Sequence, residues 1–138
     1  MKFLLDTNVI SEIRKRRCHP AVRRIINNID SENLFLSVVS IGEIKRGIQK
    51  LDSSSKKTEI SLWLSKQLPE WFGERILPLD FDVMVRWGEL CTSHNRTLTV
   101  LDSLIVATVL AHGMTLITRN TKDFEGIGGL PLLNPWES

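Results

Sequence analysis

Short apolar runs recur along the chain, and the segments between them space their apolar residues as helices do. Continuous runs at residues 2–5, 34–38, 75–79 and 114–118 are typical of buried strands, and 131–133 is long enough for a last edge strand. Strands that are apolar on both faces belong to parallel sheets covered by helices. The pattern therefore predicts a mostly parallel central sheet.

The first half of the chain shows several helix starts. One helix is expected directly after Asp6, and a second opens at His19 and Pro20, because proline suits the first helical turn. A third is expected from Ser40, with Glu43 at the capping-box position. Each of these helices follows or precedes an expected strand.

The second half continues the alternation. One apolar stripe has helical spacing, and Pro69 is expected to bend or end its helix. Further helices are expected over 80–94, closed by residues 95–97, and from Asp102 to Gly113, where glycine suits a left-handed cap. The stripe residues are Ile60, Trp63, Leu64, Leu68 and Trp71.

Strands that alternate with helices predict an α/β fold with three layers, in which helices cover both faces of the sheet. The chain has 138 residues, the usual length of one compact domain, and no linker or repeat interrupts it. We therefore expect a single domain over residues 1–138.

Composition narrows the protein class. Hydrophobic residues make up 42% and charged residues 25%, which excludes disorder, and a net charge of +2 does not by itself indicate nucleic-acid binding. Lys2 and Asp6 place charges too early for a signal peptide, and no apolar run could cross a bilayer. Cys18 and Cys91 form no paired motif, so we expect a cytoplasmic protein.

Four acidic residues lie where the predicted fold would bring them together. Asp6 follows the first strand and Asp123 follows the fourth after a short loop, whereas Glu43 and Asp102 lie in the opening turns of helices. Ligands of open parallel sheets bind beyond the carboxyl ends of the strands. The four carboxylates are therefore expected to converge in one crevice.

Each acid also has a structural explanation. Asp6 and Asp102 suit helix caps, Glu43 suits a capping box, and Asp123 suits an exposed loop. Four converging carboxylates, however, would repel by about 4 kcal/mol per pair at ~4 Å and an effective dielectric of ~20. A hard divalent cation, Mg²⁺ or Mn²⁺, removes that conflict and can activate water for attack on a phosphodiester.

Four segments carry a resemblance to a known family, and they span nearly the whole chain. They read FLLDTN at 3–8, SVVSIGE at 37–43, LDSLIVAT at 101–108 and TLITRNTKDF at 115–124. In order and spacing they resemble the motifs of PIN domains and are most similar to VapC-type toxin ribonucleases. Val106 stands where that family often has alanine, at a buried packing position.

The resemblance implies a PIN-like fold and an Mg²⁺-dependent endoribonuclease acting as the toxin of a type II toxin–antitoxin pair. It also implies a cognate antitoxin, self-association as a homodimer or larger complex, and an RNA substrate. It assigns catalysis and metal binding to Asp6, Glu43, Asp102 and Asp123. The implied supporting polar groups are Thr7, Asn8, Thr118 and Asn120.

Two further features remain open between a functional and a structural role. Arg14, Lys15, Arg16 and Arg17, with Arg23 and Arg24 nearby, could contact phosphates or could be a solvated basic patch. The apolar stripe around Trp63 and Trp71 could be core or a groove for a partner helix. Cys91 and His94 have ligand-like spacing, but without a second pair they predict no zinc site.

Fold and metal centre together do not fix the substrate, so two other functions compete with the toxin hypothesis. One is a PIN nuclease that acts in RNA processing or on DNA without an antitoxin. The other is a catalytically silent nucleic-acid-binding module, which the retention of all four acids disfavours.

Overall fold

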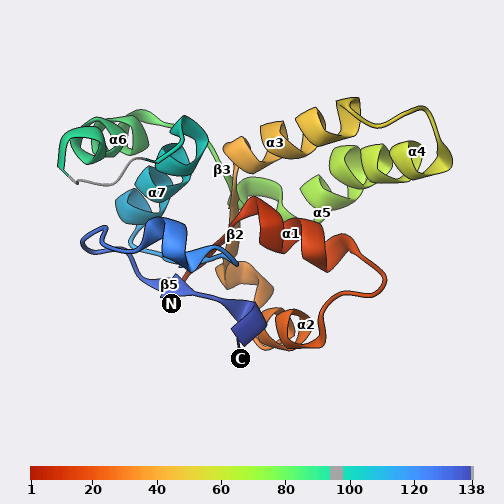
Figure 1. Cartoon of the computed structure of the whole chain (residues 1–138), viewed down its shortest axis with the longest axis horizontal. Helices are drawn as coiled ribbons and strands as arrows, with labels where there is room; N and C mark the ends of the chain where they lie inside the picture. The colour runs from red at the N-terminus through yellow and green to blue at the C-terminus, as the bar shows by residue number, and fades with distance from the viewer. Residues whose placement is uncertain (94–97, 138) are drawn as a thin grey trace.

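The computed structural model describes residues 1–93 and 98–137, within which five parallel strands form one sheet (Figure 1). The central strand is β1 (Phe3–Leu5), which pairs with β2 (Leu34–Ser37) on one side and β4 (Thr115–Ile117) on the other. The edges are β3 (Ile76–Leu77) and β5 (Leu132–Leu133), giving the order β3-β2-β1-β4-β5. The predicted parallel sheet, including its last edge strand, is confirmed.

Successive strand residues point to opposite faces of this sheet and enter two separate cores. Leu5 and Ile117 pack with helices on one face, whereas their neighbours Leu4 and Leu116 pack with helices on the other. All four are at most 1% exposed. Burial on both faces explains why the strands read as continuous apolar runs, and it confirms the predicted three-layer α/β fold.

The first face is covered by helices from the first half of the chain. They are α1 (Thr7–Arg14), α2 (Pro20–Asn27), α3 (Val38–Gln49), α4 (Ser55–Leu62), a π-helical turn (Trp63–Gln67) and α5 (Leu68–Phe72). Figure 1 shows α1, α3, α4 and α5 together on one side of the strands. Short 3-10 turns at Ser31–Asn33 and Gly73–Arg75 lead into β2 and β3.

The second face is covered by α6 (Phe81–Ser93) and α7 (Val100–His112), which pack side by side (Figure 1). Gly113 ends α7 at φ 64° and ψ 41°, the left-handed cap expected from the sequence. Two more 3-10 turns, Thr121–Phe124 and Pro135–Glu137, flank β5. His94 and the expected helix end at 95–97 lie outside the described residues.

Two expected helix starts were wrong. Helix α3 begins at Val38 rather than Ser40, because the Ser37 hydroxyl accepts a hydrogen bond from the backbone of Val39 and caps the helix earlier. Glu43 therefore lies in the second turn and is not a capping-box residue. Likewise α7 begins at Val100, because Thr99 rather than Asp102 is its cap.

Pro69 does not end its helix. The chain stays helical from α4 through the π-helical turn into α5, of which Pro69 is the second residue. The π-helical turn directly precedes this proline, whose ring and missing N–H do not fit a regular α-helical ladder. The helix runs on to Phe72 and stops at Gly73. Of the helices in the described ranges, none combines the length and apolarity needed to cross a bilayer.

Candidate active site

Asp6 is fixed at the carboxyl end of the central strand. Its backbone N–H donates to Ile117 of β4 at 2.9 Å, and its side chain caps α1 by accepting from the Thr7 N–H at 2.8 Å. Its second carboxylate oxygen accepts from the Thr118 hydroxyl at 2.8 Å, and both side chains are buried. Asp6 is therefore a helix cap, as one alternative held, and is also held rigidly at the sheet edge.

Glu43 reaches the same edge from α3. Its Oε1 accepts from the hydroxyl of Thr7, at 2.7 Å, and Thr7 follows Asp6 directly. The Thr7 hydroxyl also lies 2.7 Å from the hydroxyl of Ser40, one turn before Glu43. Thr7 thus connects two of the four acids, through its N–H to Asp6 and through its hydroxyl to Glu43.

Asp102 and Asp123 come from the other side of the sheet. Asp102 lies in the first turn of α7 and is half-buried, whereas Asp123 lies exposed in the 3-10 turn after β4. The N–H of Asp123 donates to the Asn120 carbonyl at 3.0 Å, which shapes this turn. Asp102 therefore comes from a helix of the second face, and Asp123 comes from the turn that follows β4.

The four acids form one electrostatic group. The charges of Asp102 and Glu43 raise the pKa of Asp6, and the charges of Glu43 and Asp123 raise the pKa of Asp102. In both cases burial raises the pKa more than the neighbouring acids do, whereas hydrogen bonds from Thr118 to Asp6 and from Thr99 to Asp102 lower it. Convergence is thus visible as charge coupling, with burial as the larger cause of the shifts.

The predicted supporting groups occupy the same edge. Besides binding Asp6, the Thr118 hydroxyl accepts from the Asn120 N–H at 3.2 Å. Asn8 accepts from the Arg119 N–H at 3.4 Å and approaches Asp6 at 3.5 Å with its amide nitrogen. Asn8 and Thr118 therefore hold the loop after β4 against the start of α1, and Asn120 contributes its backbone to this contact. Thr7 instead joins Asp6 to Glu43.

The donor set suits a hard cation that keeps much of its water. All four side chains offer carboxylate oxygens, which Mg²⁺ and Mn²⁺ prefer. Within the described residues, however, no three acidic, histidine or cysteine side chains are close enough to hold an ion on their own. Mg²⁺ is typically bound by one or two carboxylates together with water and substrate phosphate, so this open arrangement fits it.

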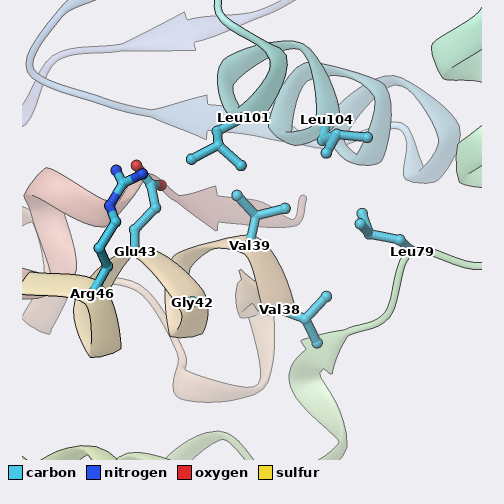
Figure 2. A pocket seen from close by; sticks show the side chains of 8 residues that line it. All are labelled: Val38, Val39, Gly42, Glu43, Arg46, Leu79, Leu101 and Leu104. Atoms are coloured by element: carbon cyan, nitrogen blue, oxygen red, sulfur yellow. The ribbon is translucent and has the colours of Figure 1, made fainter. Parts of the chain in front are cut away.

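Two pockets meet at Glu43. One, of about 390 Å³, lies between α3 and the start of α7 and is lined mainly by apolar side chains, with Glu43 and Arg46 at one end (Figure 2). The other, of about 310 Å³, runs between α1, α3 and α4 and includes Thr7, Arg14 and Lys56. Of the four acids, Glu43 is the one that lines these two pockets.

The four basic residues at 14–17 differ in what they contact. Arg14 ends α1 and lines the second pocket. Lys15 pairs with buried Glu12 at 3.1 Å, and Arg16 and Arg17 are exposed. Glu12 also accepts from the His19 N–H at 2.9 Å, a bond that lowers the pKa of Glu12 and secures the loop. The geometry thus brings Arg14 alone of these four to a pocket beside the acids.

The apolar stripe is largely core. Ile60 and Leu68 are buried, and Trp71 and Leu64 pack partly buried against the same cluster. Trp63 is partly buried too, but it also lines the pocket that leads to Glu43. The core interpretation therefore holds for most of the stripe. Ile60 and Trp63 both line the pocket, and Trp63, the less buried of the two, is the member better placed to meet a partner.

Sequence reasoning missed Ser40 as a site residue. It was read as a helix start, whereas it is fully buried inside α3 and contacts Thr7. The signal that could have found it is its spacing, because residues three apart on a helix share a face, and Glu43 follows Ser40 by three.

Comparison with known proteins agrees with this geometry. The PIN domain profile matches residues 3–130. A VapC ribonuclease, Y4jK, from Sinorhizobium fredii is 33% identical, and the match covers 98% of each chain. The crystal structure of FitAcB from Neisseria gonorrhoeae superimposes with a TM-score of 0.87 at 29% identity, covering 99% of each chain. A toxin–antitoxin complex from Klebsiella pneumoniae gives 0.69 at 26% identity, covering 97% of this chain and 98% of that one.

The match to the PIN domain profile covers far more than half of the sequence, and it agrees with a parallel α/β sheet that carries acids at its carboxyl edge. The chain belongs to the PIN domain family.

Proposed function

We propose that this protein is a divalent-metal-dependent endoribonuclease and the toxin of a type II toxin–antitoxin pair, acting as one domain in the cytoplasm. The observation that carries the proposal is the hydrogen-bonded pair of Asp6 and Glu43, joined through Thr7 at the carboxyl edge of the sheet. The charges of Asp102 and Asp123 act on the same group of acids. The similarity to a VapC ribonuclease and to a toxin–antitoxin complex supports the substrate and the biological role. The free thiols of Cys18 and Cys91 agree with a reducing compartment.

In this proposal the four acids hold Mg²⁺, or Mn²⁺, which supplies positive charge that activates water and offsets the charge of the phosphate. The protein contributes the orientation of the ligands. Thr118 and the Thr7 N–H fix the two oxygens of Asp6, and the Thr7 hydroxyl fixes Glu43. Arg14, which lines the pocket beside Glu43, is placed to contact a phosphate next to the cleaved bond.

The pocket lined by Trp63 is the proposed binding site of the antitoxin. Its lining includes apolar side chains, such as Ile60 and Leu51, and also the polar side chains of Thr7 and Glu43. A partner segment could bury apolar side chains there and block access to the acids at the same time. Occupation of this pocket would therefore explain inhibition without any change of fold.

The decisive experiment is RNA cleavage by the purified protein freed of its partner. We expect cleavage with Mg²⁺ or Mn²⁺, none with excess chelator, and a loss of at least about 100-fold for Asp6→Asn or Asp102→Asn with unchanged circular dichroism. A matched control is Asp82→Asn, the same change in the first turn of α6 on an exposed residue. Undiminished cleavage in chelator, or an active Asp6→Asn, Asp102→Asn double variant, would contradict the proposal.

A further inference from the structure

We propose that Ser40 is a positioning residue that orients the Glu43 carboxylate through the hydroxyl of Thr7 and thereby raises the affinity of the acidic edge for a divalent cation. The inference rests on the proposed function, because it needs Glu43 to take part in a metal centre. It goes beyond that function by assigning a role to a buried serine away from the acidic group itself.

The hydrogen-bond geometry gives this chain of hydroxyls a direction. The Thr7 hydroxyl has one proton, and it donates that proton to Glu43 Oε1 at 2.7 Å. In the 2.7 Å contact between Thr7 and Ser40, Thr7 must then be the acceptor and Ser40 the donor. Ser40 therefore donates a hydrogen bond to Thr7, and Thr7 donates one to Glu43. Each of these hydrogen bonds polarises and strengthens the other.

The location of Ser40 makes it suited to fixing geometry. Its side chain is 0% exposed, so water cannot replace its contact with Thr7. It lies one turn before Glu43 on α3, whereas Thr7 is the first residue of α1. The contact therefore ties the start of α1 to α3, and with it Asp6, which accepts from the Thr7 N–H, to Glu43.

Loss of this serine has a specific expected effect. In Ser40→Ala the Thr7 hydroxyl loses its donor, and the Glu43 carboxylate is held by a weaker, less oriented bond. Groups that orient metal ligands typically change metal affinity by about 10–100-fold. We expect Ser40→Ala to weaken Mn²⁺ binding by at least about tenfold.

The same helix offers a matched control. Ser37 is also 0% exposed and also lies at the start of α3, but its hydroxyl accepts from the backbone N–H of Val39. Ser37→Ala removes a helix cap and should lower the melting temperature at least as much as Ser40→Ala does. A purely structural role of Ser40 predicts equal effects on Mn²⁺ affinity, whereas the proposal predicts that Ser37→Ala binds as the parent does.

The test measures Mn²⁺ dissociation constants by electron paramagnetic resonance on the purified full chain, with melting curves for each variant. Thr7→Val breaks the hydroxyl chain at its middle, and Thr7→Ser preserves it. Because Ser40 acts through Thr7, Ser40→Ala should have no further effect in Thr7→Val and its full effect in Thr7→Ser. Should Ser40→Ala not fold, Ser40→Cys carries the test, because it keeps the bulk of the side chain but donates only a weak hydrogen bond to Thr7.

Several results would overturn the proposal. Parent-like affinity in Ser40→Ala or, if that variant is unfolded, in Ser40→Cys would do so. So would equal weakening by Ser37→Ala, or an additive loss in the Thr7→Val background. Asp102→Asn separates these from a failure of the proposed function. If Asp102→Asn binds Mn²⁺ as the parent does, the proposed metal centre is wrong, and the proposed role of Ser40 is wrong with it. If Asp102→Asn binds Mn²⁺ weakly while Ser40→Ala binds as the parent does, only the proposed role of Ser40 is wrong.

Discussion

At the scale of single residues, Asp6 and Asp102 are both buried to some degree, but different hydrogen bonds offset the effect of burial on their pKa values. Burial raises the pKa of both carboxyls, and neighbouring acids add to the shift. Asp6 is compensated by the Thr118 hydroxyl and the Thr7 N–H, whereas Asp102 is compensated by Thr99. Asp6 caps α1, whereas Thr99 rather than Asp102 caps α7. The carboxylate of Asp102 therefore contributes less to the fold than that of Asp6.

Replacing Asp102 by asparagine should therefore stabilise the metal-free protein at neutral pH. A raised carboxyl pKa means that the folded state carries the cost of the charge above that pKa, and this cost disappears as the pH falls and the folded state takes up the proton first. In chelator at pH 7 we expect Asp102→Asn to melt above the parent, by a gain that solvent screening keeps small because Asp102 is only half-buried.

That advantage should shrink as the pH falls through the raised pKa and be much reduced near pH 4, close to the ordinary aspartate pKa of about 3.9, where about half of the unfolded chains are protonated at Asp102 as well. Melting curves of both proteins from pH 4 to pH 8 measure it. An advantage that persists unchanged to pH 4 would trace the effect to something other than the Asp102 charge.

At the scale of elements, the sequence predicts the strands well, because each is short, apolar on both faces and bounded by polar residues. It predicts helix starts less well where two capping residues compete within a few positions. Ser37 and Ser40 both suit a cap before α3, and the choice depends on where β2 leaves the sheet. Thr99 and Asp102 compete in the same way before α7.

The same limit applies to the apolar stripe of α4, the π-helical turn and α5. Helical spacing shows that Ile60, Trp63 and Leu68 share a face, but it does not show what that face contacts. In the folded chain Leu68 and Ile60 are buried in the core, but Ile60 also lines a pocket together with the less buried Trp63. The partner surface therefore could not be separated from the core by sequence alone.

Trp63 is consequently the residue through which the proposed antitoxin contact can be tested. Truncated tryptophans at interface centres commonly cost about 2 kcal/mol or more, so Trp63→Ala should weaken the complex with the neighbouring gene product by at least about tenfold. Titration calorimetry measures this. The matched control is Leu62→Ala, an adjacent side chain that is 54% exposed and does not line the pocket. Parent-like binding by folded Trp63→Ala would remove this pocket from the interface.

At the scale of the whole molecule, the acidic site is a consequence of topology. All five strands run in parallel, so their carboxyl ends meet at one edge, and Asp6 sits there because β1 is central. This is why the four acids could be proposed from strand ends and helix starts. Ser40 could not, since a buried serine in a helix looks like core until its contact with Thr7 is seen.

A cation that joins acids from both layers should stabilise the whole fold, because it binds the folded state and finds no such arrangement in the unfolded chain. At about 100 times its dissociation constant, such a ligand contributes about 2.7 kcal/mol, which corresponds to several degrees in melting temperature. We expect Mg²⁺ to raise the melting temperature of the parent and of Asp82→Asn by this amount. It should have little effect on Asp102→Asn and Asp102→Ala, since both lack a charged ligand. If Asp102 merely stabilised α7, replacing it would lower the melting temperature by the same amount with and without Mg²⁺. The comparison of the four proteins in chelator and in Mg²⁺ therefore separates a metal ligand from a structural aspartate, and equal Mg²⁺ responses would remove Asp102 from the site.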